Sequence, residues 1–174
     1  MNVEFDVAQK RKGHLFFCIS GWDFNTGDVT ENKYGPDHFM DFGGTVVVMV
    51  SYRVGPFGFL CLGDEYVPGN QGLWDQQMAL RWIQQHISHF GGDKNMVTLA
   101  GHGAGSVCVS YHLVSPQSAG LFSHAICMSG TFISPSYTFD KDPELVGREF
   151  VGKLGCPDKD ESVDQILIKL QNLK

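Results

Sequence analysis

Short apolar runs alternate with amphipathic stretches along most of this chain. Four runs of large apolar residues, each bounded by glycine or polar residues, are typical of buried β-strands and lie at 14–20, 45–51, 96–100 and 124–129. Apolar residues recur at three- and four-residue spacing in 72–90 and from 104 to about 114, which predicts a helix in each segment. Gly55-Pro56 and Gly58 predict a turn. Buried strands that alternate with amphipathic helices predict an α/β fold with a parallel sheet.

Two further helices are predicted after the last strand. The first begins with Asp142 as N-cap and Pro143 at its first position, and the second opens at a capping box over 162–165. Their expected buried residues are Val146, Phe150 and Leu154 in the first helix and Ile166, Leu167, Leu170 and Leu173 in the second. No later strand follows, so the apolar edge at 124–129 is left unpaired. We therefore expect residues 1–174 to form a single partial domain.

Charge and cysteine content exclude several functions. The chain has 13 Lys and Arg against 19 Asp and Glu, a net charge of −6, and no basic run, so neither nucleic acid nor an anionic membrane surface is an expected partner. No apolar stretch is long enough to span a membrane, and the first residues show no secretory signal pattern. The cysteines are scattered and odd in number, without metal-ligand spacing, so no metal site is expected and most should be buried: Cys18, Cys61, Cys108, Cys127 and Cys156.

The candidate chemistry lies in 98–106, which predicts a strand that turns sharply into a helix. Its Gly101-His-Gly-Ala-Gly105 segment is close to the Gly-x-Ser-x-Gly nucleophile elbow, in which a serine on the tight turn presents its hydroxyl at the sheet edge. Gly103 occupies the serine position. A glycine has no side chain that could attack a carbonyl carbon or be activated by a base. The segment therefore predicts the frame of an acyl-transfer site without its nucleophile.

Several blocks together resemble the type-B carboxylesterase/cholinesterase family of α/β-hydrolases. The matching blocks, with the spacing between them, are 51–60, 69–75, 79–83, 90–93, 101–105, 120–122 and 129–130. The resemblance covers nearly all of this chain but only about the middle third of a family member. It implies a partial α/β-hydrolase fold with a mostly parallel sheet and flanking helices. It also implies that the strands carrying the family's acid and histidine lie beyond residue 174.

The family's mechanism needs a serine, a base, an acid and an oxyanion hole. By the resemblance, Gly103 replaces the serine, and His102 stands where active members carry an acidic residue. Ala104 follows the serine position and keeps one backbone N–H donor for the oxyanion.

The other oxyanion donors belong to a glycine-rich loop that aligns with 20–27. Gly21 is kept, but Trp22 and Asp23 occupy the two glycine positions whose N–H groups would bind the oxyanion. A carboxylate there would repel the charge that the hole must stabilise, and losing one donor alone costs about 10²–10³ in rate. The resemblance therefore implies a degenerate oxyanion loop as well as a degenerate elbow.

Two structural features are also implied by the resemblance. Arg53 and Asp75 correspond to a family arginine and aspartate that pair beneath the active site, so a buried ion pair is expected. Cys156 corresponds to a family cysteine that closes a short disulfide loop. Its partner position falls at about Lys169, so we expect Cys156 to be a free thiol in this chain.

Other residues are weaker candidates for chemistry. Ser106 lies one turn into the helix, where a surface or cap-like serine is the expected role. His102, His112 and Asp23 do not have the spacing of metal ligands, so no new site is expected from them. We expect the histidines to be hydrogen-bonded core residues or surface residues. Cys108 lies between valines, which indicates burial and not a reactive thiol.

Two functions stay open. One is a non-catalytic esterase-like protein that keeps the scaffold to bind another protein, as in the neuroligin type of adhesion protein. The other is a carboxylic-ester hydrolase, represented here by a partial or degenerate copy. An intact downstream acid and histidine would favour the enzyme, whereas their loss together with a membrane anchor would favour the binding protein. The resemblance implies an extracellular or membrane-associated protein, and no cofactor is expected.

Overall fold

A central sheet of five strands organises the computed structural model, which describes residues 2–4, 13–19, 23–26, 41, 43–135, 142–155, 165–166 and 168. The strands are β1 (Asn2–Glu4), β2 (Gly13–Ile19), β3 (Thr45–Val50), β4 (Gly92–His102) and β5 (His124–Met128), and their order in the sheet is β1-β3-β2-β4-β5. β1 runs antiparallel to β3, while β2, β3, β4 and β5 are mutually parallel. The predicted α/β class with a mostly parallel sheet is confirmed, and β1 adds an antiparallel edge.

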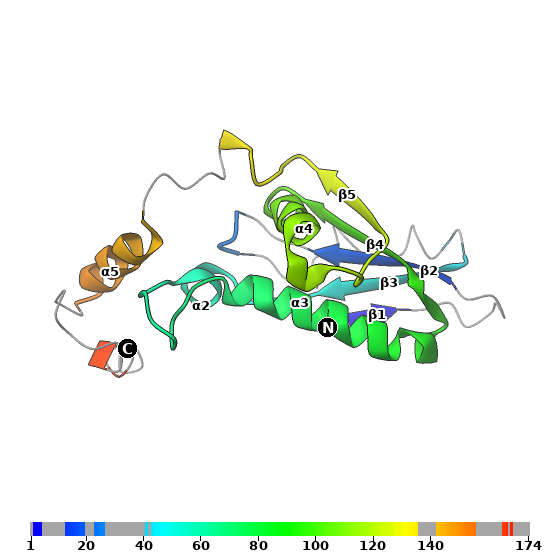
Figure 1. The fold of residues 1–174 in the computed structure, drawn as a ribbon, viewed down its shortest axis with the longest axis horizontal. Helices are drawn as coiled ribbons and strands as arrows, with labels where there is room; N and C mark the ends of the chain where they lie inside the picture. Colours follow the sequence, from blue (N-terminus) through cyan, green and yellow to red (C-terminus); the bar gives the residue numbers. More distant parts are fainter. Residues whose placement is uncertain are drawn as a thin grey trace.

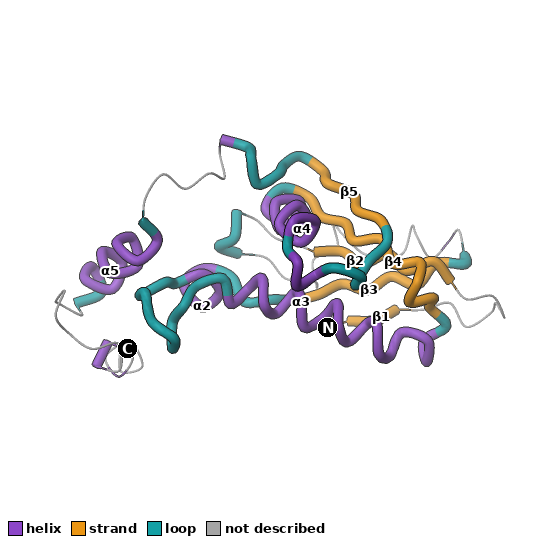
Figure 2. The backbone as a smooth tube through the Cα atoms, in the orientation of Figure 1, coloured by secondary structure: helices purple, strands orange, loops and turns teal. Residues whose placement is uncertain are grey.

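Two helices cover one face of this sheet (Figures 1 and 2). α3 (Gln71–His86) continues into the 3₁₀ turn η1 (Ile87–Phe90), and α4 (Ala104–Val114) follows β4 directly. The core beneath them joins side chains of the central strands to side chains of both helices: Leu15, Phe17, Ile19, Val48, Leu80, Ile83, Ile87, Leu99, Cys108 and Val109. Every second residue of β2 points into this core, which is the period expected of a strand.

A short helix replaces the turn predicted after β3. α2 (Gly55–Phe59) carries Pro56 in its first turn, where the fixed φ of proline suits a helix start. Gly58 lies so close to the Arg53 carbonyl that a Cβ atom there would overlap it. Pro56 and Gly58, which predicted a turn, therefore also permit one tight turn of helix. None of the described helices is long and apolar enough to cross a membrane.

A second, smaller core lies under α5 (Pro143–Lys153), on the left of Figure 1. Asp142 caps this helix by accepting a hydrogen bond from the Glu144 N–H, as predicted. The predicted buried face was wrong, because Val146, Phe150 and Leu154 are 36–44% exposed. The buried positions are Gly147 and Val151, since a Cβ at Gly147 would overlap the Cys61 carbonyl and only that face can approach.

Little of the predicted last helix is described. Ile166 is buried in the smaller core with Leu62, Val67 and Val151. Leu167, Leu170 and Leu173 lie outside the described residues, and so does Cys156.

β5 is the edge of the sheet on the side away from β1. It pairs with β4 from His124 to Met128, and no other described strand pairs with it. Ile126 and Met128 are 42% and 40% exposed. The strand carries neither a lysine nor a proline, the residues that commonly protect such an edge from pairing with another chain.

We therefore expect the isolated 174-residue chain to self-associate through β5. Ile126→Lys should shift the chain toward monomer, because a charged side chain on an edge strand opposes further strand pairing. Sedimentation velocity over a range of concentrations measures this, with Gln85→Lys on the exposed side of α3 as the matched control. A wild-type chain that stays monomeric and melts cooperatively at high concentration would contradict the prediction.

Candidate functional site

The candidate site lies where β4 turns into α4. β4 ends at His102, α4 begins at Ala104, and Gly103 alone makes the turn, with φ 57° and ψ −122°. The Gly103 N–H donates to the Met128 carbonyl at 2.9 Å, which ties the turn to the end of β5. The turn thus sits at the carboxyl end of a parallel strand, where open α/β sheets place their ligands.

Gly101 and Gly105 allow α4 to start so close to the sheet. A Cβ at Gly101 would overlap the Gly105 carbonyl, and a Cβ at Gly105 would overlap the Ile19 carbonyl. Both contacts are with backbone atoms, which cannot move aside as a flexible side chain can. The two glycines of the motif are therefore required by the strand–helix approach itself.

Gly103 holds the backbone conformation of a strained elbow without the strain. A residue with a Cβ pays of order 1–3 kcal/mol for such a sparsely populated region, whereas glycine adopts it freely. His102 before it is exposed and Ala104 after it is buried. The Ala104 N–H belongs to the first turn of α4, whose donors have no acceptor within the helix. At this turn Ala104 therefore has a backbone N–H without an acceptor in the helix, and Gly103 has no side chain that could act as a nucleophile.

The loop that the resemblance aligns with the family's oxyanion loop is described only in part. Gly21 and Trp22 lie outside the described residues. Asp23 is exposed and has φ 49°, and Phe24 beside it has φ 62°. The Phe24 carbonyl accepts a hydrogen bond from the Gly55 N–H at 2.6 Å. The Phe24 ring packs edge-on against the Phe59 ring. The Asp23 carboxylate therefore sits on a turn that is anchored to the start of α2.

Ser106 is buried and is not presented at the turn. The sequence predicted a surface or cap-like serine, and this was wrong: Ser106 is fully buried and its hydroxyl donates to the Gly130 carbonyl at 2.5 Å. Ser110, one turn later, donates to the Val107 carbonyl and accepts from the Phe132 N–H. Both hydroxyls thus bind main-chain groups, and they hold the segment after β5 against α4.

Comparison with known proteins identifies the family of this chain. The sequence model of the carboxylesterase family matches residues 5–174. This chain belongs to the carboxylesterase family. Mouse neuroligin-2 is 37% identical over 92% of the chain and 19% of its own length. Bovine bile salt-activated lipase is 42% identical over 74% of the chain and 21% of its own length, and venom carboxylesterase-6 of Apis mellifera is 44% identical over 78% and 24%. The chain thus spans about a fifth to a quarter of the length of these relatives.

Arg53 and Asp75 form an ion pair in this family member, but not a buried one. The guanidinium Nη2 lies 2.7 Å and Nε 2.8 Å from the two carboxylate oxygens, and the Arg53 N–H also donates to Asp75. The side chain of Arg53 is 54% exposed and that of Asp75 is 17% exposed. The expected burial is therefore wrong for the arginine. The hydrogen bonds from Arg53 hold the pKa of Asp75 below its usual value.

His112 is a satisfied core histidine in a network that the sequence did not reveal. Its Nε2 lies 3.0 Å from Gln76 Oε1 and its Nδ1 lies 2.8 Å from Ser118 Oγ. An amide oxygen only accepts, so Nε2 carries the proton and Nδ1 accepts from Ser118. Gln76 Nε2 in turn donates to the Cys108 thiol at 3.3 Å. The sequence signal that could have revealed this network is Gln76, a glutamine at a buried position of the helix α3.

Burial sets the protonation states of this network. Removal from water lowers the pKa of His112 to about 4 and raises the pKa of Cys108 to about 11. A neutral imidazole and a neutral thiol are poor starting points for catalysis by a thiolate. Within the part of the chain that is described, no three His, Cys, Asp or Glu side chains are grouped to hold a metal ion.

The lowered pKa of His112 makes stability depend on pH. The unfolded chain protonates its histidine near pH 6.5 and the folded chain only near pH 4, so stability is complete above about 6.5 and falls toward 4. A shift of this size corresponds to about 3 kcal/mol. His112→Gln should flatten this part of the curve, which denaturant unfolding at several pH values measures. An equal slope in wild type and variant would contradict a buried neutral imidazole.

The exposure of Arg53 reduces what its ion pair contributes. Asp75→Asn should lower the free energy of unfolding by about 1–2 kcal/mol at pH 7, because the pair is bidentate but half exposed. The loss should vanish as pH falls through the lowered pKa of Asp75, since the wild-type carboxylate is then protonated too. Thermal melts of wild type, Asp75→Asn, Arg53→Met and the double variant measure the coupling. A loss above about 3 kcal/mol would contradict an ion pair whose arginine is half exposed.

Proposed function

We propose that this protein is a catalytically inactive member of the carboxylesterase family that serves as a scaffold for binding another protein. The observation that carries the proposal is Gly103 at the elbow. Its φ and ψ of 57° and −122° hold the turn on which the reaction needs a nucleophile, and its side chain is a hydrogen atom. An acyl-enzyme cannot form at a position that has no oxygen or sulfur.

Two further observations support inactivity. The nearest serine along the helix, Ser106, is buried and its hydroxyl is bound to the Gly130 carbonyl, so it is not presented to a substrate. The loop that would complete the oxyanion hole carries an exposed carboxylate at Asp23. The oxyanion hole is usually the largest single contribution to acyl transfer, so this loss adds to that of the serine.

The scaffold role rests on what is retained. The elbow glycines, the sheet and the covering helices keep the fold while the chemistry is lost, which is expected where the surface of the fold carries the function. Mouse neuroligin-2 matches 92% of the chain, and this is the type of family member that the scaffold role resembles. We also propose that residues 1–174 are part of one larger carboxylesterase-like domain, in which further strands cover β5.

A degenerate copy of an ester hydrolase is the second candidate. The relatives at 42–44% identity bear the names of a lipase and carboxylesterases, and the elbow still has the backbone conformation that a serine would need. Under this alternative the site was lost by a few substitutions. Repair of those positions should then restore turnover.

Repairing the site in steps separates the two candidates. We expect no covalent labelling of the wild-type protein by a serine-directed fluorophosphonate and no turnover of a short acyl ester. Gly103→Ser alone should also give no turnover. Trp22 and Asp23 still occupy the oxyanion positions, and in residues 1–174 no general base is expected within reach of the new hydroxyl. The decisive variant combines Gly103→Ser with Trp22→Gly and Asp23→Gly, and Gly103→Ala is the matched control for strain at the elbow.

Each outcome favours one candidate. Stoichiometric labelling of the wild type, at Ser106 or any other serine, would overturn the proposed inactivity. Turnover by the triple variant, with none by Gly103→Ala, would support the degenerate enzyme. These variants are made in a protein that includes the segment beyond residue 174, because the resemblance implies that the histidine and the acid lie there. No turnover by such a triple variant that melts like wild type supports the scaffold.

A further inference from the structure

Two histidines from separate strands converge on the face of the sheet that lies away from α3 and α4. His14 is in β2, His124 is in β5, and Thr98 is in β4, the strand between them. Leu15 and Val97 point into the core under the helices, so their neighbours His14 and Thr98 point to the opposite face. His124 is paired directly with Thr98 in the register of β4 and β5, which places its side chain on that face too.

The two imidazole rings are close enough to share one metal ion. Two strand spacings, about 9–10 Å, separate the backbones of β2 and β5, whereas the ring centroids are only 6.1 Å apart. A metal–nitrogen bond of about 2.0–2.1 Å, with about 1.1–1.2 Å from nitrogen to ring centre, allows at most about 6.4 Å between two rings on one ion. Tetrahedral coordination needs about 5 Å, which rotation of the exposed His124 side chain can supply.

Thr98 orients one of these rings. Its hydroxyl oxygen lies 2.7 Å from His14 Nε2, and the residue is only 6% exposed. A metal-binding histidine commonly donates its second ring N–H to an oxygen, which fixes the tautomer and the direction of the ring. With the proton on Nε2 and Thr98 as its acceptor, the lone pair of His14 is on Nδ1, where it can bind a metal ion.

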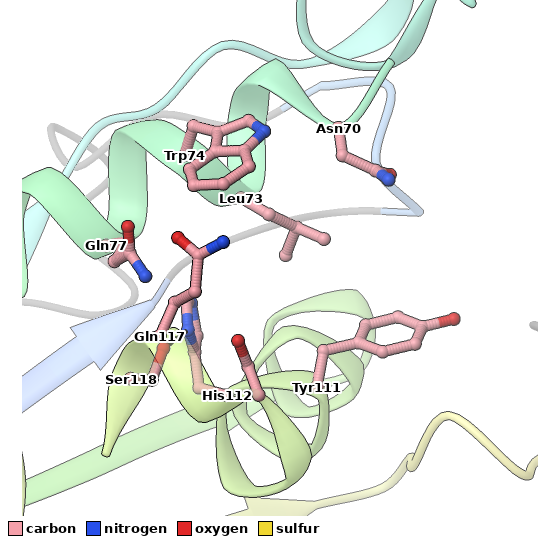
Figure 3. A pocket seen from close by; sticks show the side chains of 9 residues that line it. Asn70, Leu73, Trp74, Gln77, Tyr111, His112, Gln117 and Ser118 are labelled. Atoms are coloured by element: carbon pink, nitrogen blue, oxygen red, sulfur yellow. Dashed lines mark hydrogen bonds between the residues drawn. The ribbon is translucent and has the colours of Figure 1, made fainter. Parts of the chain in front are cut away.

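Other described histidines fit a metal ion less well. His112 lies beside the hollow between α3 and α4 (Figure 3), and both its ring nitrogens are already hydrogen-bonded. The rings of His86 and His89, at the end of α3 and in η1, are 6.5 Å apart, slightly above the limit for one ion. The His86 ring also packs against the Trp82 ring, with centroids 5.1 Å apart, which holds it in place.

We propose that His14 and His124 together bind one divalent transition-metal ion of the copper, nickel or zinc type. Imidazole nitrogen suits these ions, whereas calcium and magnesium prefer oxygen ligands. Two protein ligands leave further coordination positions to water or to a ligand from outside the chain. The two histidines lie far apart in the sequence and meet only in the sheet, so no ligand spacing marks them.

The test uses copper(II) as the probe, because it binds most tightly in the usual order of divalent ions. Calorimetric titration of the full chain should show one tight copper(II) site, and its electron paramagnetic resonance spectrum should show two nitrogen ligands. His14→Gln and His124→Gln should each weaken binding at least tenfold, because the second imidazole no longer binds as an intramolecular ligand. The matched control is the double variant His86→Gln with His89→Gln, which should bind like wild type.

Several outcomes would overturn the proposal. One is unchanged copper affinity in either folded single variant, since both imidazoles bind the same ion. Loss of the tight site in the His86→Gln and His89→Gln control would place the ion elsewhere, and a spectrum with a single nitrogen ligand would exclude the pair. Circular dichroism shows whether each variant is folded. His124 is exposed, so His124→Gln decides the question if His14→Gln fails to fold.

Discussion

The close approach of backbone to backbone at the β4–α4 turn is the constraint on which the rest of the site depends. Gly101 packs against the backbone of Gly105, and Gly105 packs against the Ile19 carbonyl at the end of β2. Neither contact leaves room for a Cβ atom on the glycine. This contact sets the position of α4 over the sheet and leaves Gly103 as the single turning residue. It is a requirement of packing and not of catalysis, so it persists although the residue at the turn is a glycine.

α4 then determines where the neighbouring segments lie. Its small residues face the sheet, while Ser106 and Ser110 bind main-chain groups of the segment after β5. Further along, His112 and Cys108 join the Gln76 amide of α3, so that every polar group of this chain of contacts has a partner. A satisfied buried network of this kind specifies one register between two helices, because any slip would leave polar groups unpaired.

Several exposed surfaces support the proposal that residues 1–174 are part of a larger domain. The guanidinium of Arg53 is half exposed although its partner carboxylate is largely covered, and β5 presents an apolar edge. The outer face of α5 is similarly apolar and exposed. Each of these surfaces belongs to a chain that spans about a fifth to a quarter of its relatives' length.

The sequence by itself determined the four parallel strands, the helices α3, α4 and α5, and the glycine at the strand–helix turn, because these depend on local pattern and on residue identity. It did not predict the strand β1 or the helix α2. It did not determine which face of α5 is buried, since Val146 and Phe150 fit the helix period but Gly147 alone fits against Cys61. The burial of Ser106 and the His112 network were likewise decided only by the tertiary structure. Their environments are made by residues far away in the chain, and no local pattern carries that information.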